Sequence, residues 1–159
     1  MVEPPQRGWN VEWFEAFPRN VEWVWVELPD PSDAFCLNYE PFLIFAARSR
    51  RALDFAPDPQ TIAARLADFR RASSDLANHY EGLIAAADAY AATIDRAGQD
   101  VPPCIYVTKG AFDGVGVRCD GPLVVIEGTA RQIARSRFPP RPERALLGLS
   151  PTMDQWPYY

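Results

Sequence analysis

Histidine and cysteine are scarce in this chain, and their scarcity excludes several kinds of site. His79 is the only histidine among 159 residues, so a cluster of imidazole ligands is excluded and any histidine-dependent triad would depend on that residue. The chain has three cysteines, Cys36, Cys104 and Cys119, and no two of them have CxxC spacing. An odd number of widely spaced cysteines fits neither a disulfide framework nor a zinc motif. We therefore expect no metal site and no cofactor.

Long apolar runs are also missing. Charged residues interrupt every hydrophobic stretch, so none approaches the roughly 18 residues of a membrane-spanning helix. The first ten residues lack the apolar middle of a secretory signal, which leads us to expect a cytoplasmic protein without a membrane segment. The composition, 48% hydrophobic and 23% charged, suits a single domain over residues 1–159.

The net charge of −5 is distributed unevenly along the chain. Residues 1–40 carry eight acids and two arginines, whereas residues 131–159 carry five arginines and two acids. Either the two ends attract each other within the fold, which we favour, or the acidic end faces a basic partner. An acidic surface repels phosphates, so we expect no binding of nucleic acid.

An apolar stripe runs along residues 59–97 at alternating intervals of four and three residues, which places it on one face of an α-helix. Asp58 is the expected N-cap, Pro59 suits the first helical position, and Gly98 is the natural stop. The stripe consists of Ile62, Leu66, Phe69, Ser73, Leu76, Tyr80, Leu83, Ala87, Tyr90 and Ile94.

An unbroken helix over this range would be about 58 Å long, whereas a domain of this size is about 40 Å across. The helix therefore has to bend or break near Ser73-Ser74-Asp75, whose side chains compete for backbone hydrogen bonds. We favour a bend, because the stripe stays in register through the serines. Pairing of the helix with a second copy, in a homodimer, is the alternative.

Strands are predicted in both halves of the chain. Residues 21–28 are β-branched and aromatic up to Pro29, and residues 10–17 are either another short strand or a short helix capped by Asn10. A second strand is expected from Phe42 to Ala47. The basic run at residues 48–51 interrupts it, and residues 52–55 resume the pairing or turn back.

After the helix we expect a three-stranded meander of residues 104–108, 115–119 and 123–127. If Thr108 opposes Val115, then Cys104 opposes Cys119, and the two sulfurs come within reach of a disulfide. We interpret them instead as reduced core thiols. A short helix capped by Thr129 is expected over residues 130–137, one helical turn over residues 145–149, and the terminal aromatic residues packed on the body.

These elements together predict an α+β fold, in which an antiparallel or mixed sheet packs against one long, bent central helix. Two possible sites carry little support. One is catalysis by His79, for which the spacing of residues in the sequence indicates no acid or nucleophile as a partner. The junction at Gly128-Thr129, with Arg131 and Arg135 one turn apart, has the form of an anion site, but such arginines more often pair with acids of the same protein.

Tryptophans interleaved with glutamates near the N-terminus form the most unusual local composition. We expect most of these tryptophans to lie in the core. Any that stay exposed beside the acids are well suited to bind an arginine-rich or lysine-rich protein surface. We therefore predict a small acidic protein-binding module, of the kind found in an immunity protein that neutralises a toxin or in a phage inhibitor of a nuclease. The candidate contact residues are Glu12, Trp13, Glu22, Trp23, Trp25 and Glu27.

Two other functions stay open. One is a small-molecule-binding domain with a pocket between helix and sheet, lined by Phe69, Tyr80, Tyr90, Tyr106 and Trp23. The other is an enzyme with dispersed arginine and carboxylate residues, for which we identify no catalytic residue.

Overall fold

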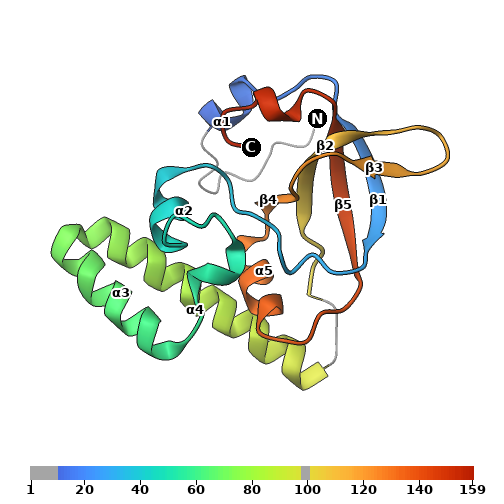
Figure 1. Ribbon diagram of the computed structural model, residues 1–159. Coiled ribbons are helices and arrows are strands. Elements are labelled where there is room, and N and C mark those ends of the chain that lie inside the picture. Colours follow the sequence, from blue (N-terminus) through green and yellow to red (C-terminus); the bar gives the residue numbers. More distant parts are fainter. Residues whose placement is uncertain (1–10, 98–100) are drawn as a thin grey trace.

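A five-stranded mixed sheet forms one side of the molecule and helices form the other, so the α+β class is confirmed (Figure 1). The computed structural model describes residues 11–97 and 101–159, with only the backbone at 11–12 and 95–97. The strands are β1 (Glu22–Leu28), β2 (Ile105–Phe112), β3 (Val117–Cys119), β4 (Val124–Glu127) and β5 (Glu143–Ser150). The helices are α1 (Val11–Glu15), α2 (Glu40–Phe45), α3 (Pro59–Ala72), α4 (Ser74–Ala97) and α5 (Thr129–Ser136), with 3₁₀ turns at Ala52–Phe55 and Met153–Gln155.

Strand β5 lies in the middle of the sheet, where it pairs antiparallel with β1 and parallel with β2. The helical turn predicted for residues 145–149 is therefore wrong. Ala145, Leu147 and Leu149 are buried on one face of the sheet, and the residues between them point to the other face. This two-residue alternation is typical of a strand. Among the described residues β1 is the first strand and β5 the last, so the sheet joins segments that are far apart in the sequence.

Strands β3 and β4 both pair with β2, β3 with its C-terminal part and β4 with its N-terminal part, so the three strands do not form the predicted meander. The register pairs Gly110 with Cys119, so the predicted pairing of Cys104 with Cys119 is wrong by six residues. Cys104 is buried, Cys119 is exposed, and both are free thiols. The turn is set by Asp113, whose carboxylate accepts hydrogen bonds from the amides of Val115 and Gly116 at 3.0 and 2.9 Å.

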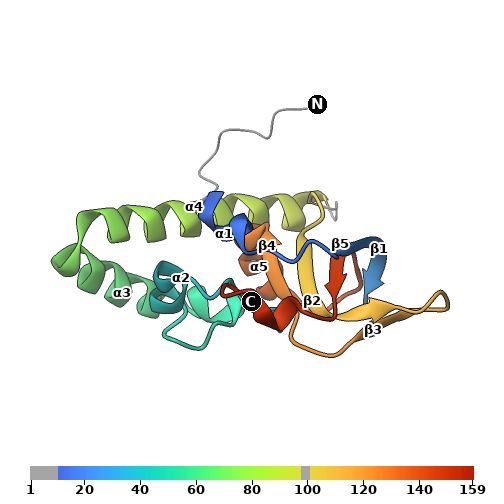
Figure 2. The same ribbon diagram turned by 90° about the horizontal axis from the view of Figure 1, so that it is seen from above.

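The long apolar stripe belongs to two helices rather than to one bent helix. Ser73 has an extended backbone between α3 and α4, and the two helices lie side by side as a helical hairpin (Figures 1 and 2). The N-cap prediction is confirmed, because Asp58 accepts a hydrogen bond from the amide of Thr61 at 2.8 Å. Gly98, the predicted stop, lies outside the described residues.

The members of the stripe still point inward. Phe69, Tyr80, Ala87 and Ile94 are buried, and most of the others are partly buried, whereas Ser73 at the break is exposed. The Tyr80 hydroxyl donates to the carbonyl of Phe55 at 2.5 Å and so ties α4 to the segment before α3. The apolar face is therefore used within the chain.

The strand predicted at residues 42–47 is wrong, because α2 occupies most of this range. A short apolar run does not distinguish a strand from a buried helix, and Pro41 in the first turn favours the helix. The residues that follow reverse the chain through positive φ angles at Ala47, Arg48 and Arg50. Arg48 forms a bidentate pair with Glu40 at 2.7 and 3.0 Å, so part of the basic run is paired within the protein.

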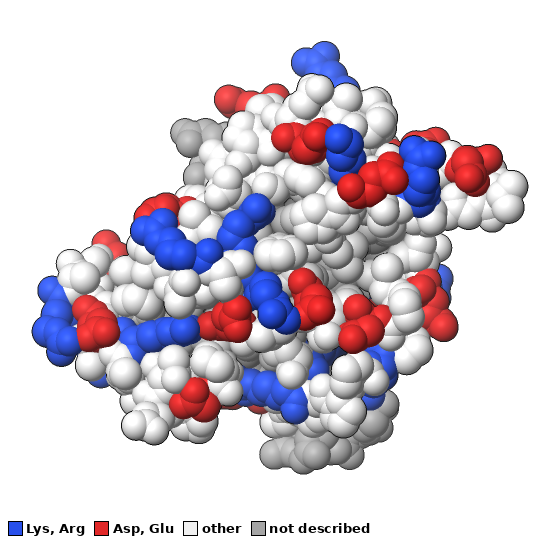
Figure 3. Space-filling view, in the orientation of Figure 1, with Lys and Arg blue, Asp and Glu red and all other residues white. Residues whose placement is uncertain are grey.

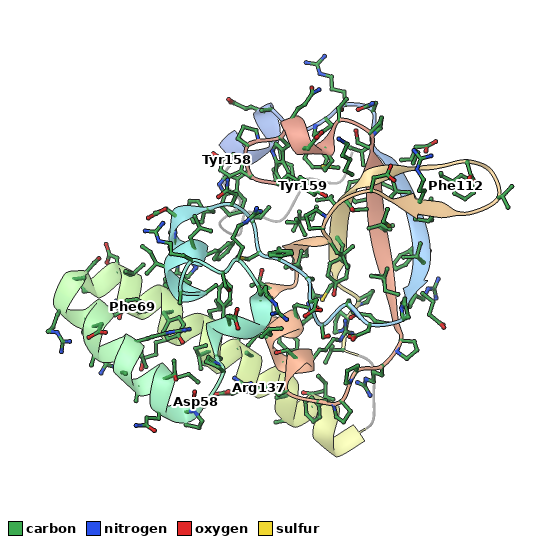
Figure 4. The ribbon with its side chains drawn as sticks, viewed as in Figure 1. Asp58, Phe69, Phe112, Arg137, Tyr158 and Tyr159 are labelled. Carbon is green, nitrogen blue, oxygen red and sulfur yellow. The ribbon has the colours of Figure 1, made fainter. Side chains whose placement is uncertain are left out.

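Helix α5 lies between the sheet and the helical hairpin (Figure 1). The predicted helix is confirmed, but Gly128, with φ of 99°, is its N-cap in place of Thr129. The opposite face of the sheet is partly covered by α1 and the C-terminal segment, where Trp156 is buried and its indole donates to the carbonyl of Trp13 at 2.6 Å. Figure 4 shows Tyr158 and Tyr159 on this C-terminal segment, so the terminal aromatics do pack on the body.

Gly82 provides a test of the helical hairpin. It lies within α4, exposed, and an added Cβ would meet no atom within 4 Å. Gly82→Ala should therefore raise the free energy of unfolding by about 1 kcal/mol, since alanine loses less backbone freedom in a helix. Urea unfolding measures this change. Gly114→Ala is the control, because Gly114 has φ of +84° and alanine there should destabilise; equal effects would contradict the assignment.

Candidate functional site

Strand β1 presents four of the six predicted contact residues to solvent. Trp23 is 45% exposed and Trp25 is 55% exposed, values that are high for large aromatic side chains. Glu22 and Glu27 are exposed near the two ends of the strand. Alternation places Glu27 on the face of the tryptophans and Glu22 on the other face. These four residues, Glu22, Trp23, Trp25 and Glu27, are called the β1 surface below.

The other two predicted contact residues are not on the β1 surface. Trp13 is partly buried and packs against Tyr39, with ring centroids 5.0 Å apart, and against Tyr158 at 5.9 Å. The side chain of Glu12 lies outside the described residues. The structure therefore brings the four candidate residues of β1 together and leaves Trp13 packed among aromatic residues away from them.

Both exposed tryptophans are held by neighbours on one side. The ring of Trp23 crosses Gly148 of β5 so closely that a Cβ at Gly148 would lie 2.8 Å from it. Phe17 stacks on the same ring at 6.4 Å. The guanidinium of Arg144 lies 4.9 Å from the centre of the Trp25 ring, which restricts that ring. The two tryptophan rings of the β1 surface are thus held in position by neighbouring residues and remain partly exposed to solvent.

The backbone of β1 is also open along one edge. In the described ranges, 11–97 and 101–159, β1 pairs with β5 on one side and no strand pairs with its other side. An edge strand of this kind presents alternate amide and carbonyl groups that another extended segment can pair with.

A pocket of about 310 Å³ lies at the end of β1, and Trp25 forms part of its wall. The segments that enclose it are residues 30–32, the C-terminal half of α5, and the proline-rich stretch that leads into β5. Gln132, Arg135 and Glu143 form its polar side. We call it the β1 pocket; its apolar lining comprises Trp25, Val101, Phe138 and the prolines at 31, 103, 139, 140 and 142.

The polar side of the β1 pocket is a buried network. Arg135 forms an ion pair with Glu143, and the side chains of these residues are only 14% and 5% exposed. Arg135 also donates to the carbonyl of Val101 at 3.2 Å. The Tyr106 hydroxyl donates to the side-chain oxygen of Gln132 at 2.5 Å, and Gln132 donates to the carbonyl of Pro31 at 2.5 Å. The network fixes α5 against β2, β5 and the segment after β1.

Sequence reasoning did not identify Glu143 or Gln132. A signal existed for Glu143, because it precedes Ala145, Leu147 and Leu149 in the two-residue alternation of buried positions. A charged residue at a buried position of a strand needs a partner of opposite charge inside the protein.

Burial raises the pKa of several side chains in the core of the protein. Burial raises the pKa of the Cys36 thiol to about 12. Burial, followed by the neighbouring Cys104 thiol, raises the pKa of Tyr106 above its ordinary value, and burial raises the pKa of Tyr80. These groups therefore stay protonated at neutral pH.

A wider groove of about 660 Å³ runs between α4 and the β4–α5 junction, and His79 lies at its side. At this junction the favoured interpretation is confirmed for Arg131, which pairs with an acid of the same protein instead of forming an anion site. Arg131 donates to the carbonyls of Pro102 and Pro103, both at 3.1 Å, and pairs with Glu127 at 2.9 Å. Its guanidinium is therefore used to hold the chain segment before β2.

The five aromatic residues expected to line a pocket do not converge. Phe69 and Tyr80 pack in the helical core, Tyr106 lies in the sheet core, and Tyr90 borders the groove. Among the described residues no group of three or more His, Cys, Asp or Glu side chains is arranged to hold a metal ion. Within the same residues, no helix has the length and apolar character needed to span a membrane.

Comparison with known proteins gives no identification. No family model, no curated protein and no solved structure matches this chain. The β1 surface and the β1 pocket are therefore the features from which a function can be inferred.

The buried ion pair should contribute much more to stability than an exposed one. Glu143→Gln leaves Arg135 buried without its counter-charge, so the free energy of unfolding should fall by about 3 kcal/mol. Asp88→Asn is the matched control, because Asp88 pairs with Arg137 at 2.6 Å in a more exposed position, where the loss should stay below about 1 kcal/mol. Figure 4 shows Arg137 beside α4. Urea unfolding that gave equal losses would contradict the buried network.

Stability should fall at alkaline pH. The Cys36 thiol has its pKa near 9.0 when exposed and about 12 when folded, so between these values the unfolded chain loses a proton that the folded chain keeps. Unfolding is then favoured as pH rises, by up to about 1.4 kcal/mol per pH unit for each such group. Urea unfolding under reducing conditions from pH 8 to 11 measures the slope. Cys36→Ala should reduce it above pH 9; an unchanged slope would refute this origin.

Proposed function

We propose that this protein is a binding module that recognises an extended, basic segment of a partner protein along strand β1. The observation that carries the proposal is an edge strand of seven residues with two exposed tryptophans and an unpaired outer side. A partner segment added to this edge would gain backbone hydrogen bonds and contact with the aromatic rings.

The tryptophans supply the energy in this proposal. Each exposed ring is large, and covering the area that is still exposed would contribute about 2 kcal/mol. Phe17 and Arg144 already restrict the two rings, so less conformational entropy is lost when a partner covers them. Positioned aromatic side chains of this kind are typical hot spots of protein interfaces.

Charge favours a basic segment. Residues 22–30 contain Glu22, Glu27 and Asp30 and no basic residue. Arg144 lies on β5, one strand further from the open edge, so a new strand would have the acids as its direct neighbours. Acidic and basic side chains are interspersed over the face in Figure 3, so the preference comes from the strand and not from a broad charged surface.

An inhibitor or immunity-type protein would use such a strand to cover a basic surface of a toxin or nuclease. This use needs only a complementary surface, because a protein that covers another protein's active site requires no catalytic residue of its own.

The test uses a photo-crosslinking amino acid in place of Glu27, expressed in the native cell, to identify the partner. The purified partner is then titrated against the unmodified protein and against Trp23→Ser/Trp25→Ser. We expect the dissociation constant of the double variant to rise at least 100-fold, about 2.7 kcal/mol. Glu27→Lys should also weaken binding, because it places like charges together.

The control is Phe112→Ser. Phe112 is 44% exposed but lies on the β2–β3 hairpin, which projects away from the body (Figures 1 and 4). The dissociation constant of the Phe112→Ser variant for the partner should stay within twofold of that of the unmodified protein. The proposal is refuted if no partner is crosslinked, if the double tryptophan variant binds normally, or if Phe112→Ser abolishes binding while the tryptophan variant does not.

A further inference from the structure

The β1 pocket has features of a small-molecule site, which the protein-binding proposal does not use. We propose that it binds a small anionic ligand with a planar, hydrogen-bonding ring, the chemistry of a nucleoside monophosphate. The argument rests on three parts of the pocket: its polar side, its apolar walls and its rim.

The polar side offers hydrogen-bonding capacity that the protein does not use fully. Gln132 is completely buried and its amide is bonded to Tyr106 and Pro31, so it supports the wall and does not meet a ligand. One oxygen of Glu143 meets Arg135 and the other has only a long contact of 3.4 Å, with the Tyr106 hydroxyl. A ligand edge with a hydrogen-bond donor would match this second oxygen, as the amino group of a nucleobase does.

The walls suit a flat ring. Trp25, Phe138 and five prolines line the pocket, and they present flat apolar surfaces with few rotatable bonds. The volume of about 310 Å³ lies at the lower end of the range for small-molecule sites. A nucleobase with its ribose is therefore about the largest group that the pocket can enclose, with the phosphate at the rim, and a dinucleotide cofactor is too large.

The rim supplies the anion preference. Arg141 and Arg144 are exposed at the rim and form no salt bridge within the part of the chain that the structure describes. Arg135 and Glu143 neutralise one another, so the two rim arginines outweigh Asp30, which is the remaining acid of the lining. Arginine presents paired donors that match phosphate oxygens.

The test is isothermal titration of the purified protein with adenosine, guanosine, cytidine and uridine monophosphates. We expect at least one to bind with a dissociation constant below 1 mM. Its nucleoside should bind at least tenfold more weakly, because it lacks the phosphate, and phenyl phosphate should also bind at least tenfold more weakly, because it has no hydrogen-bonding edge.

Arg141→Gln/Arg144→Gln should weaken binding at least tenfold and change the melting temperature little, because both side chains are exposed and the contact of Arg144 with the Trp25 ring is a surface contact. Arg19→Gln, an exposed arginine elsewhere, is the control and should bind normally. The proposal is overturned if none of the four monophosphates binds below 1 mM, if nucleoside or phenyl phosphate binds as tightly as the monophosphate, or if the rim variant binds normally. Neither the tryptophan variant nor the partner enters this test, so its outcome is independent of the protein-binding proposal.

Discussion

The pairing of β5 with both β1 and β2 is the constraint on which the rest of the structure depends. It brings the first strand of the chain beside the last and leaves β1 at the open edge of the sheet. It also sets Glu143 at the start of β5, where the carboxylate meets Arg135 of α5. A buried charge pair tolerates little displacement, because either charge alone in the core is strongly unfavourable. The ion pair therefore fixes the position of α5 relative to the sheet.

This arrangement places two different surfaces next to each other. Trp25 belongs to the open edge and also to the wall of the β1 pocket, and Arg144 contacts its ring from the neighbouring strand. The edge offers backbone groups and aromatic area, whereas the pocket offers buried polar groups and two rim arginines. Strand pairing produces both, since β1 ends where the proline-rich segment enters β5.

The sequence predicted the local features well and the long-range pairing poorly. The apolar stripe, the cap at Asp58 and the strand at residues 21–28 were correct, because each depends on neighbouring residues. The position of β5 depends on partners 40 and 120 residues away, and the short run at residues 145–149 is compatible with a helical turn. No element of the described residues covers Trp25 fully, and composition does not reveal this. The buried pair of Arg135 and Glu143 required knowing that α5 crosses the start of β5.

Amide hydrogen exchange along β1 and β5 tests the central claim most directly. If β5 lies inside the sheet, the amides of Leu146, Leu147 and Leu149 should be among the slowest to exchange, since β5 has a strand on each side. In β1 protected and fast amides should alternate, because every second amide faces the open edge. Uniform protection along β1, or fast exchange throughout β5, would contradict the sheet order and with it the open edge.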